Sequence, residues 1–95
     1  KNLTIIKTLG HEGLELIKSN GKIRKIPAFS VNSISSHGAG DMFIGALAAR
    51  YLIGDTMENA LVYAQAAAAL FISKAEEERA GITQRAVIDF MENNL

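Results

Sequence analysis

The residues with the clearest chemical potential are the tetrad Gly38-Ala39-Gly40-Asp41, which leads directly into the apolar stretch Met42–Leu47. Two glycines permit a tight turn with outward-facing N–H groups, and a helix that begins there adds the positive end of its dipole. A phosphate could bind at such a turn, but an aspartate beside it would repel the phosphate. The carboxylate makes more sense as a base or a metal partner. Phosphoryl transfer to a hydroxyl needs both an oxyanion cradle and a base.

A purely structural interpretation of the tetrad has about equal weight on these residues alone, because glycine before a helix and Asp in its first turn are both common. The other motifs are weaker. Gly10-x-x-Gly13 follows an apolar segment, and a glycine-rich turn between strands is its commoner meaning. His11 and His37 have no second histidine or acid at ligand spacing, so we predict no metal site formed by side chains.

Composition limits the function classes. The 95 residues suffice for one small domain, with 48% hydrophobic residues and a mean hydropathy of +0.13. The net charge is zero, which disfavours nucleic acid and acidic membrane surfaces as partners. Any phosphate must therefore be held locally. The chain has no cysteine, no signal peptide and no run of ~18 apolar residues, so we expect a cytoplasmic protein without a membrane partner.

The first third of the chain predicts a small β unit. Residues 2–9 are β-branched and apolar, which indicates a buried strand, and residues 14–18 half-alternate as a second strand. Asn20-Gly21 is a strong hairpin signal that favours a type I′ turn into a third strand over 22–26. Pro27 ends that strand or places it at an edge.

The remainder predicts a Ser-rich connection over 28–37 and then helices. From Ala39 the pattern is helical, and residues 42–53 are apolar almost all round apart from Arg50, as expected for a helix buried within a larger body. Asp55 and Glu58 resemble a capping box for a helix over about 57–77, whose last turn includes a solvated face at 76–79. Thr83 caps a short last helix. We predict one domain over 1–95, divided into a β unit (1–27), a connection (28–37) and a helical part (38–95).

A family resemblance raises the weight of the tetrad. Residues 35–47, SSHGAGDMFIGAL, resemble the signature D-T-x-G-A-G-D-x-F-x-G-A-L of the ribokinase-like (PfkB) carbohydrate kinases. Upstream, Thr8–Gly13 resembles the family's T-L-G-x-x-G nucleotide loop. Downstream, Tyr63–Ala69 resembles its A-N-A-A-A helix. Order and spacing agree across essentially all 95 residues, which correspond to the last third of a typical member.

The resemblance implies an α/β fold, the ribokinase-like three-layer sandwich, of which this chain would be the carboxy-terminal portion, a short β unit followed by three helices. It implies an ATP-dependent kinase acting on a sugar or related hydroxyl, with Asp41 as the general base and Mg²⁺ bridging the ATP phosphates. The anion hole would be the amides of Gly38, Ala39 and Gly40. The nucleotide-binding residues would be Thr8, Leu9, Gly10, Gly13 and Gln65.

Departures from the signature leave other interpretations open. Ser35-Ser36 replaces the Asp-Thr whose Asp often helps to build a monovalent-cation site, so dependence on such a cation is doubtful. The acceptor is unreadable, and a nucleoside or phosphosugar kinase of the same fold is an alternative. Another is a non-catalytic nucleotide- or phosphate-binding module in which Asp41 only starts a helix. Because the chain starts at Lys1 without an initiator Met, we interpret it as a fragment, inactive alone, of a protein that the resemblance inclines us to regard as a homodimer.

Overall fold

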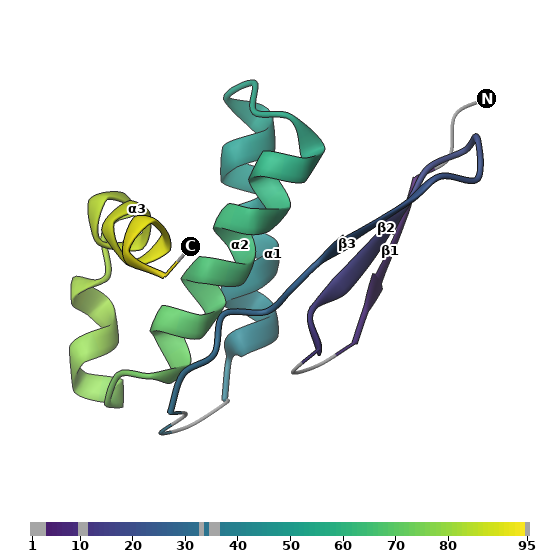
Figure 1. Ribbon diagram of the computed structural model, residues 1–95. Helices are drawn as coiled ribbons and strands as arrows, with labels where there is room; N and C mark the ends of the chain where they lie inside the picture. Colours follow the sequence, from purple (N-terminus) through teal and green to yellow (C-terminus); the bar gives the residue numbers. More distant parts are fainter. Residues whose placement is uncertain (1–3, 10–11, 33, 35–36, 95) are drawn as a thin grey trace.

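The computed structural model describes residues 4–9, 12–32, 34 and 37–94. Within them, strands precede helices in the predicted order (Figure 1). The strands are β1 (Ile5–Thr8), β2 (Leu14–Ile17) and β3 (Ile23–Ile26). The helices are α1 (Ala39–Leu52), α2 (Met57–Ile72), the 3-10 helix η2 (Glu76–Gly81) and α3 (Gln84–Asn93).

The three strands form an antiparallel sheet in the order β1-β2-β3. Leu14 and Leu16 alternate along β2 with partly exposed residues and are fully buried, as the period of two requires. The register pairs Leu14 with Ile26, so one face of the sheet presents buried apolar side chains to the helices.

The hairpin turn lies where it was predicted, but type I′ is wrong. That type needs a positive φ at both central residues, whereas Gly21 has a φ of +85° and Asn20 does not have a positive φ. The Gly21 N–H donates to the Lys18 carbonyl at 2.9 Å, and the Lys18 N–H donates to the Lys22 carbonyl at 2.9 Å. This pattern is a three-residue loop in which a tight turn is followed by a left-handed glycine.

Helix α2 is the centre of the packing. Figure 1 shows the sheet on one side of the α1–α2 pair and α3 on the other. Towards the sheet, Leu61 packs with Leu14, Leu16 and Ile26. On the other side, a second cluster is formed by Tyr63, Ala66, Ala67, Leu70 and Val87. The alanines of α2 allow its neighbours to approach closely, as the Ala-rich segment predicted.

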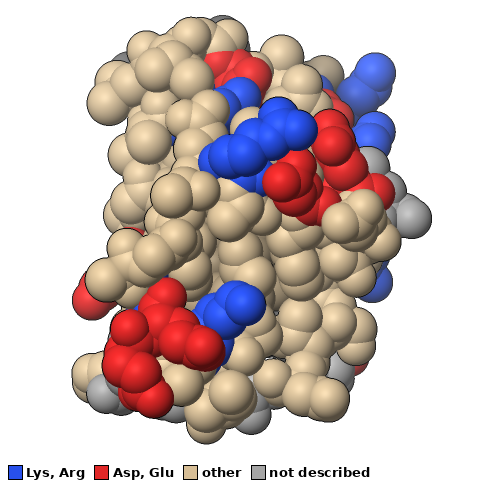
Figure 2. Space-filling model, turned by 90° about the vertical axis from the view of Figure 1, so that its left-hand side faces the viewer, with Lys and Arg blue, Asp and Glu red and all other residues tan. Residues whose placement is uncertain are grey.

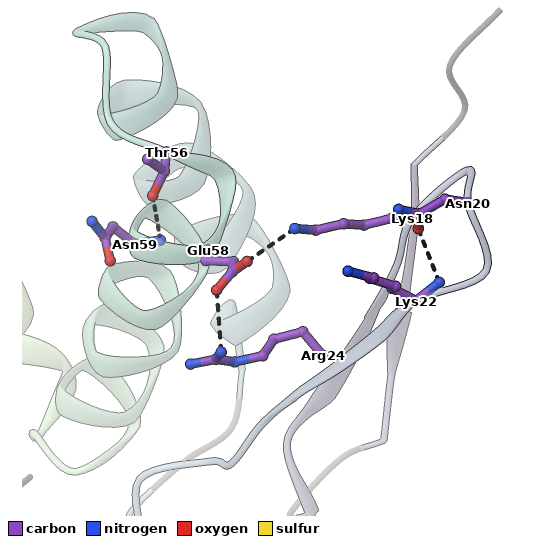
Figure 3. A network of polar contacts seen from close by, with 7 residues as sticks. All are labelled: Lys18, Asn20, Lys22, Arg24, Thr56, Glu58 and Asn59. Atoms are coloured by element: carbon purple, nitrogen blue, oxygen red, sulfur yellow. Dashed lines mark hydrogen bonds and ion pairs between the residues drawn. The ribbon is translucent and has the colours of Figure 1, made fainter.

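The start of α2 corrects the predicted capping box. Thr56, and not Asp55, is the N-cap, and its Oγ1 accepts the Asn59 N–H at 3.1 Å. Glu58 instead reaches the hairpin, where its carboxylate lies 3.2 Å from Lys18 Nζ and 3.6 Å from Arg24 Nη1 (Figure 3). These partly exposed ion pairs tie the hairpin to α2, each contributing up to about 1 kcal/mol.

Of two further predicted helix ends, the end of α2 is wrong and the start of α3 is confirmed. We predicted that α2 would run to about residue 77, but it ends at Ile72 and the chain continues through Ser73 into η2. The Ser73 hydroxyl donates to the Leu70 carbonyl at 2.7 Å, a local bond that competes with the helical pattern. Thr83 does cap α3, because its Oγ1 accepts the Ala86 N–H at 3.1 Å.

Two segments that we expected to be buried are exposed in this chain. None of the described residues of β1 is fully buried, nor is any residue of α1. Leu52 at the end of α1 is 83% exposed, and Ile53 is 68% exposed. Among the described residues, we find no helix with both the length and the apolar character to cross a membrane.

Candidate functional site

The tetrad forms the turn into α1 that its residues predicted. Gly38 is the N-cap, with φ +82° and ψ 0°, and its carbonyl accepts the Met42 N–H at 3.0 Å. A left-handed φ is inexpensive only for glycine. The first N–H groups of a helix have no acceptor within the helix, and a glycine N-cap has no side chain to supply one. The amides of Ala39 and Gly40 are therefore donors at the positive end of α1.

Asp41 is exposed in the first turn of α1 and lines an open pocket of about 410 Å³. The pocket wall also contains Gly38, Met42, Gly45, Ala46 and Phe71. The structure thus brings the predicted base and the predicted anion-hole glycine to one concave surface. Phe71, from the far end of α2, was not predicted for the site.

Gly38 and Gly40 differ in whether backbone conformation and packing require a glycine. An added Cβ on Gly38 would lie 3.3 Å from Phe71 Cε2, and the positive φ already disfavours other residues. Gly40 has an ordinary helical backbone, and outside its own helix an added Cβ would meet no atom of the described residues within 4 Å. Glycine destabilises a helix relative to alanine, so packing in this chain gives no reason for Gly40. The space above it is open to a ligand.

Arg79 is a second residue whose role was not foreseen. We predicted a solvated charged face for residues 76–79, and Figure 2 shows acidic side chains gathered at the end of the molecule where η2 lies. Arg79 is different, because it is only 9% exposed. Its guanidinium carbon lies 4.3 Å from the centroid of the Phe71 ring, and its Nη1 donates to the His37 carbonyl at 3.1 Å. Its Nε donates to the Lys74 carbonyl at 3.2 Å.

The predicted nucleotide loop lies between β1 and β2. The Leu9 N–H donates to the Gly13 carbonyl at 2.7 Å, and Thr8 is exposed at the end of β1. Gly10 is outside the described residues. Gly13 is buried with a φ of +98°, and an added Cβ would overlap the Ile26 carbonyl oxygen. Packing alone therefore explains Gly13, and a nucleotide role for the loop stays a prediction.

Gln65 lies in the middle of α2 and does not line the pocket at Asp41. Its Nε2 is buried and has no hydrogen-bond partner among the residues that the structure describes. A buried amide nitrogen without an acceptor is destabilising by about 1–3 kcal/mol, so such a group calls for an explanation. An acceptor atom on a bound ligand would satisfy it, which fits the predicted nucleotide contact.

A second hollow of about 480 Å³ lies between α2 and α3 and was not predicted. Arg50 is central to it, because its Nε pairs with Asp55 Oδ2 at 2.8 Å and its guanidinium lies 4.9 Å from the Tyr63 ring centroid. Burial raises the pKa of the Tyr63 hydroxyl above its usual 10.0, and the Arg50 charge offsets part of that shift. These contacts account for the polar groups there as structural ones.

A metal ion would find few ligands in the described part of the chain. No three His, Asp or Glu side chains among the described residues gather closely enough to hold one. The groups at the start of α1 are instead helix-end amides and one carboxylate, a combination suited to an anion and a proton rather than to a bare cation.

Known proteins resemble this chain in sequence. Residues 2–80 match the family model described as pfkB family carbohydrate kinase. A 2-dehydro-3-deoxygalactonokinase of Haloferax volcanii is 36% identical over 67 residues, which are 70% of this chain and 21% of that protein. The chain therefore spans about a fifth of the length of that relative.

Solved structures show the same fold. The ribokinase of Thermotoga maritima is similar with a TM-score of 0.82 and 30% identity, over 95% of this chain and 30% of that one. An E. coli structure in complex with ATP and Mg²⁺ has a TM-score of 0.83 and 24% identity, over 95% of this chain and 29% of that one. The predicted α/β fold, a ribokinase-like arrangement with a short β unit before three helices, is confirmed.

Proposed function

The chain belongs to the pfkB family of carbohydrate kinases, and we propose that it carries the phosphoryl-transfer machinery of an ATP-dependent kinase for a sugar hydroxyl. The observation that carries the proposal is the start of α1, where exposed Asp41 and the glycine turn share one open pocket. Because the chain spans about a fifth to a third of the length of the similar proteins, we propose that it acts within a longer kinase.

In this proposal, the amides of Gly38, Ala39 and Gly40 hold the charge of the transferring phosphoryl group. Backbone donors fixed at a helix start cost no reorganisation when charge develops, and each one contributes roughly 10²–10³ in rate. The open space above Gly40 lets phosphoryl oxygens approach the backbone closely. The dipole of α1, a helix of 14 residues, adds a favourable potential at the same place.

Asp41 takes the proton of the attacking hydroxyl. Its carboxylate projects from the first turn, adjacent to the amides, so that a hydroxyl bound in the pocket could donate to it while facing the phosphoryl group. General-base catalysis of this kind contributes about 10²–10⁴ in rate. Holding base and acceptor together adds a proximity advantage, which is why we expect little activity from this chain by itself.

ATP is the proposed ligand of the remaining predicted residues. Thr8, Leu9, Gly10 and Gly13 would lie along the nucleotide, and the unpaired Nε2 of Gln65 would donate to it. Mg²⁺, which accompanies ATP in a structural neighbour, would neutralise charge on the phosphates when bound. We do not include a monovalent cation, because Ser35 and Ser36 replace the family's Asp-Thr and lie outside the described residues. A sugar is the proposed acceptor, with a nucleoside or phosphosugar as alternatives.

The test is Asp41→Asn in the longest available form of the protein, assayed with ATP and Mg²⁺ on a panel of sugars, sugar acids and nucleosides. We expect turnover to fall by about 10²–10⁴ while ATP affinity changes little. The matched control is Asp89→Asn, because Asp89 is an exposed aspartate on α3 paired with Arg85 at 3.2 Å. Unchanged turnover in Asp41→Asn would show that Asp41 only starts the helix. ATP binding without phosphorylation of any acceptor would favour a binding module.

A further inference from the structure

The peptide unit between His37 and Gly38 is held from a distance along the chain. The connection before α1 runs past the end of α2, where the Ile34 N–H donates to the Ile72 carbonyl at 2.8 Å. Arg79, which follows 42 residues after His37, then donates from Nη1 to the His37 carbonyl at 3.1 Å. The carbonyl of that peptide unit therefore faces a buried cation.

Because a peptide unit is planar, this contact also determines the direction of the Gly38 N–H. In a trans peptide the C=O and the N–H point in opposite directions. With the His37 carbonyl directed at the Arg79 guanidinium, the Gly38 N–H is directed away from it. A positive charge at the carbonyl also polarises the unit, which strengthens the N–H as a donor. The Gly38 amide is the first of the three that the proposed anion hole uses.

A second path links the same two residues through Phe71. The guanidinium carbon of Arg79 lies 4.3 Å from the centre of the Phe71 ring, and this ring lies against Gly38 and lines the pocket at Asp41. A guanidinium in this position can stack on the ring while its separate N–H groups bond the His37 and Lys74 carbonyls. A lysine has one compact charge and could not do all three.

We propose that Arg79 is a positioning residue for phosphoryl transfer, which orients and polarises the His37–Gly38 peptide so that the Gly38 N–H serves the anion hole. The inference rests on the proposed function of the tetrad. It places a functional side chain in η2, outside all three motifs that carry the family resemblance. Burial of a charged side chain is otherwise expensive, and the carbonyl partners of Arg79 are what make it tolerable.

The first test observes the peptide unit directly and needs no activity. His37–Gly38 is the one place in this chain where a histidine precedes a glycine. Labelling His carbonyls with ¹³C and Gly amides with ¹⁵N therefore selects this unit in an HNCO spectrum. We expect Arg79→Lys and Arg79→Met to shift the His37 carbonyl and the Gly38 amide proton upfield. The control is Arg85→Met, because Arg85 is an exposed arginine on α3, and it should leave both unchanged.

The second test is kinetic. In the same variants we expect kcat to fall about tenfold or more, with the KM for acceptor and for ATP nearly unchanged. Affinity for a planar phosphoryl mimic such as ADP with aluminium fluoride should fall by the same factor. Arg79→Lys should retain more of both than Arg79→Met, because it keeps the charge.

The outcomes separate this inference from the proposed function. Shifted peptide resonances with an unchanged kcat, in a protein whose Asp41→Asn variant is inactive, would overturn the role of Arg79 and leave the kinase proposal standing. A lower melting temperature with normal resonances and a normal affinity for the mimic would also overturn it, since Arg79 would then be structural only. Unchanged turnover in both Arg79→Met and Asp41→Asn would refute the roles proposed for Asp41 and Arg79, whereas no phosphorylation of any acceptor by the unsubstituted protein would refute the proposed function itself.

Discussion

Replacing Gly40 by alanine separates stability from function more sharply than any other substitution in the tetrad. Gly40 lies at the second position of α1, with an ordinary helical φ. Apart from the adjacent helix backbone, none of the described residues would have an atom within 4 Å of an added Cβ. The fold therefore has no steric objection to alanine, which is a better helix former. Any harm that this substitution does must come from a ligand or from a surface outside this chain that packs on α1.

The two expected effects have opposite signs. Alanine in place of an unconstrained helical glycine should raise the free energy of unfolding by about 0.5 kcal/mol, the lower end of the usual range because the site is in the first turn. The methyl group would occupy the space through which phosphoryl oxygens reach the Gly40 amide. We expect kcat/KM to fall by about 10², the loss associated with one oxyanion-hole donor.

The assay combines urea unfolding with phosphoryl transfer on the same preparations. The control is Gly81→Ala, because an added Cβ on Gly81 likewise meets no atom of the described residues within 4 Å apart from the adjacent backbone, and Gly81 lies at the end of η2 and not in the first turn of α1. It should leave turnover unchanged. If Gly40→Ala is more stable and retains full activity, no ligand approaches the start of α1 from that side. The anion-hole proposal would then be wrong, whatever Asp41 does.

Two further predictions concern packing. Gly13→Ala should destabilise the protein by at least about 2 kcal/mol in urea unfolding, because a φ of +98° is combined with overlap of the added Cβ with the Ile26 carbonyl. The control Gly21→Ala, with a similar φ and open space around the added Cβ, should cost about 1 kcal/mol. Equal losses of stability in the two variants would argue against the overlap. The pKa of Tyr63 is raised by burial, so its folded state holds the proton more tightly; that contribution is complete below pH 10 and disappears as the pH rises through the folded pKa. Tyr63→Phe should therefore lessen the loss of stability above pH 10, and identical alkaline unfolding curves for the variant and the unsubstituted protein would contradict the prediction.

Local rules predicted the elements that local chemistry specifies. The glycine turn before α1, the Thr83 cap and the three strands all depend on residues adjacent in the chain, and all are present. Where a short segment suits two backbone conformations, the sequence alone did not predict which one forms. Asn20-Gly21 suits both a type I′ turn and a three-residue loop with a left-handed glycine, and the second is the one that forms.

Burial could not be predicted from this sequence in the same way. The apolar face of α1 and the strand β1 have the composition of buried elements, yet Ile44 is 65% exposed and Leu52 is 83% exposed. An apolar pattern says that an element has a partner, but it does not say that the partner lies in the same 95 residues. Such large exposed side chains are expected where another surface packs against them.

The residues that surround the tetrad needed the three-dimensional structure for a different reason. No sequence spacing links Phe71 or Arg79 to Gly38. The break between α2 and η2 brings them to Gly38, and we predicted a helix that continued through this break. A longer α2 would have carried Arg79 away from the His37 carbonyl. Ending the helix at Ile72 lets η2 fold the guanidinium back onto the ring of Phe71.

The signature by itself does not orient the Gly38 amide in the proposed mechanism. In the proposed function the glycines supply donors and Asp41 a base, but a donor serves an anion only if its peptide plane is fixed before the anion arrives. In this chain the signature departs from the family pattern at Ser35-Ser36, immediately before the peptide unit that the Arg79 guanidinium bonds. On this proposal, a chain with the same tetrad and no cation at that carbonyl would hold its Gly38 amide less firmly. On this proposal, competence at the start of α1 is a joint property of the tetrad and η2, two segments that only the fold brings together.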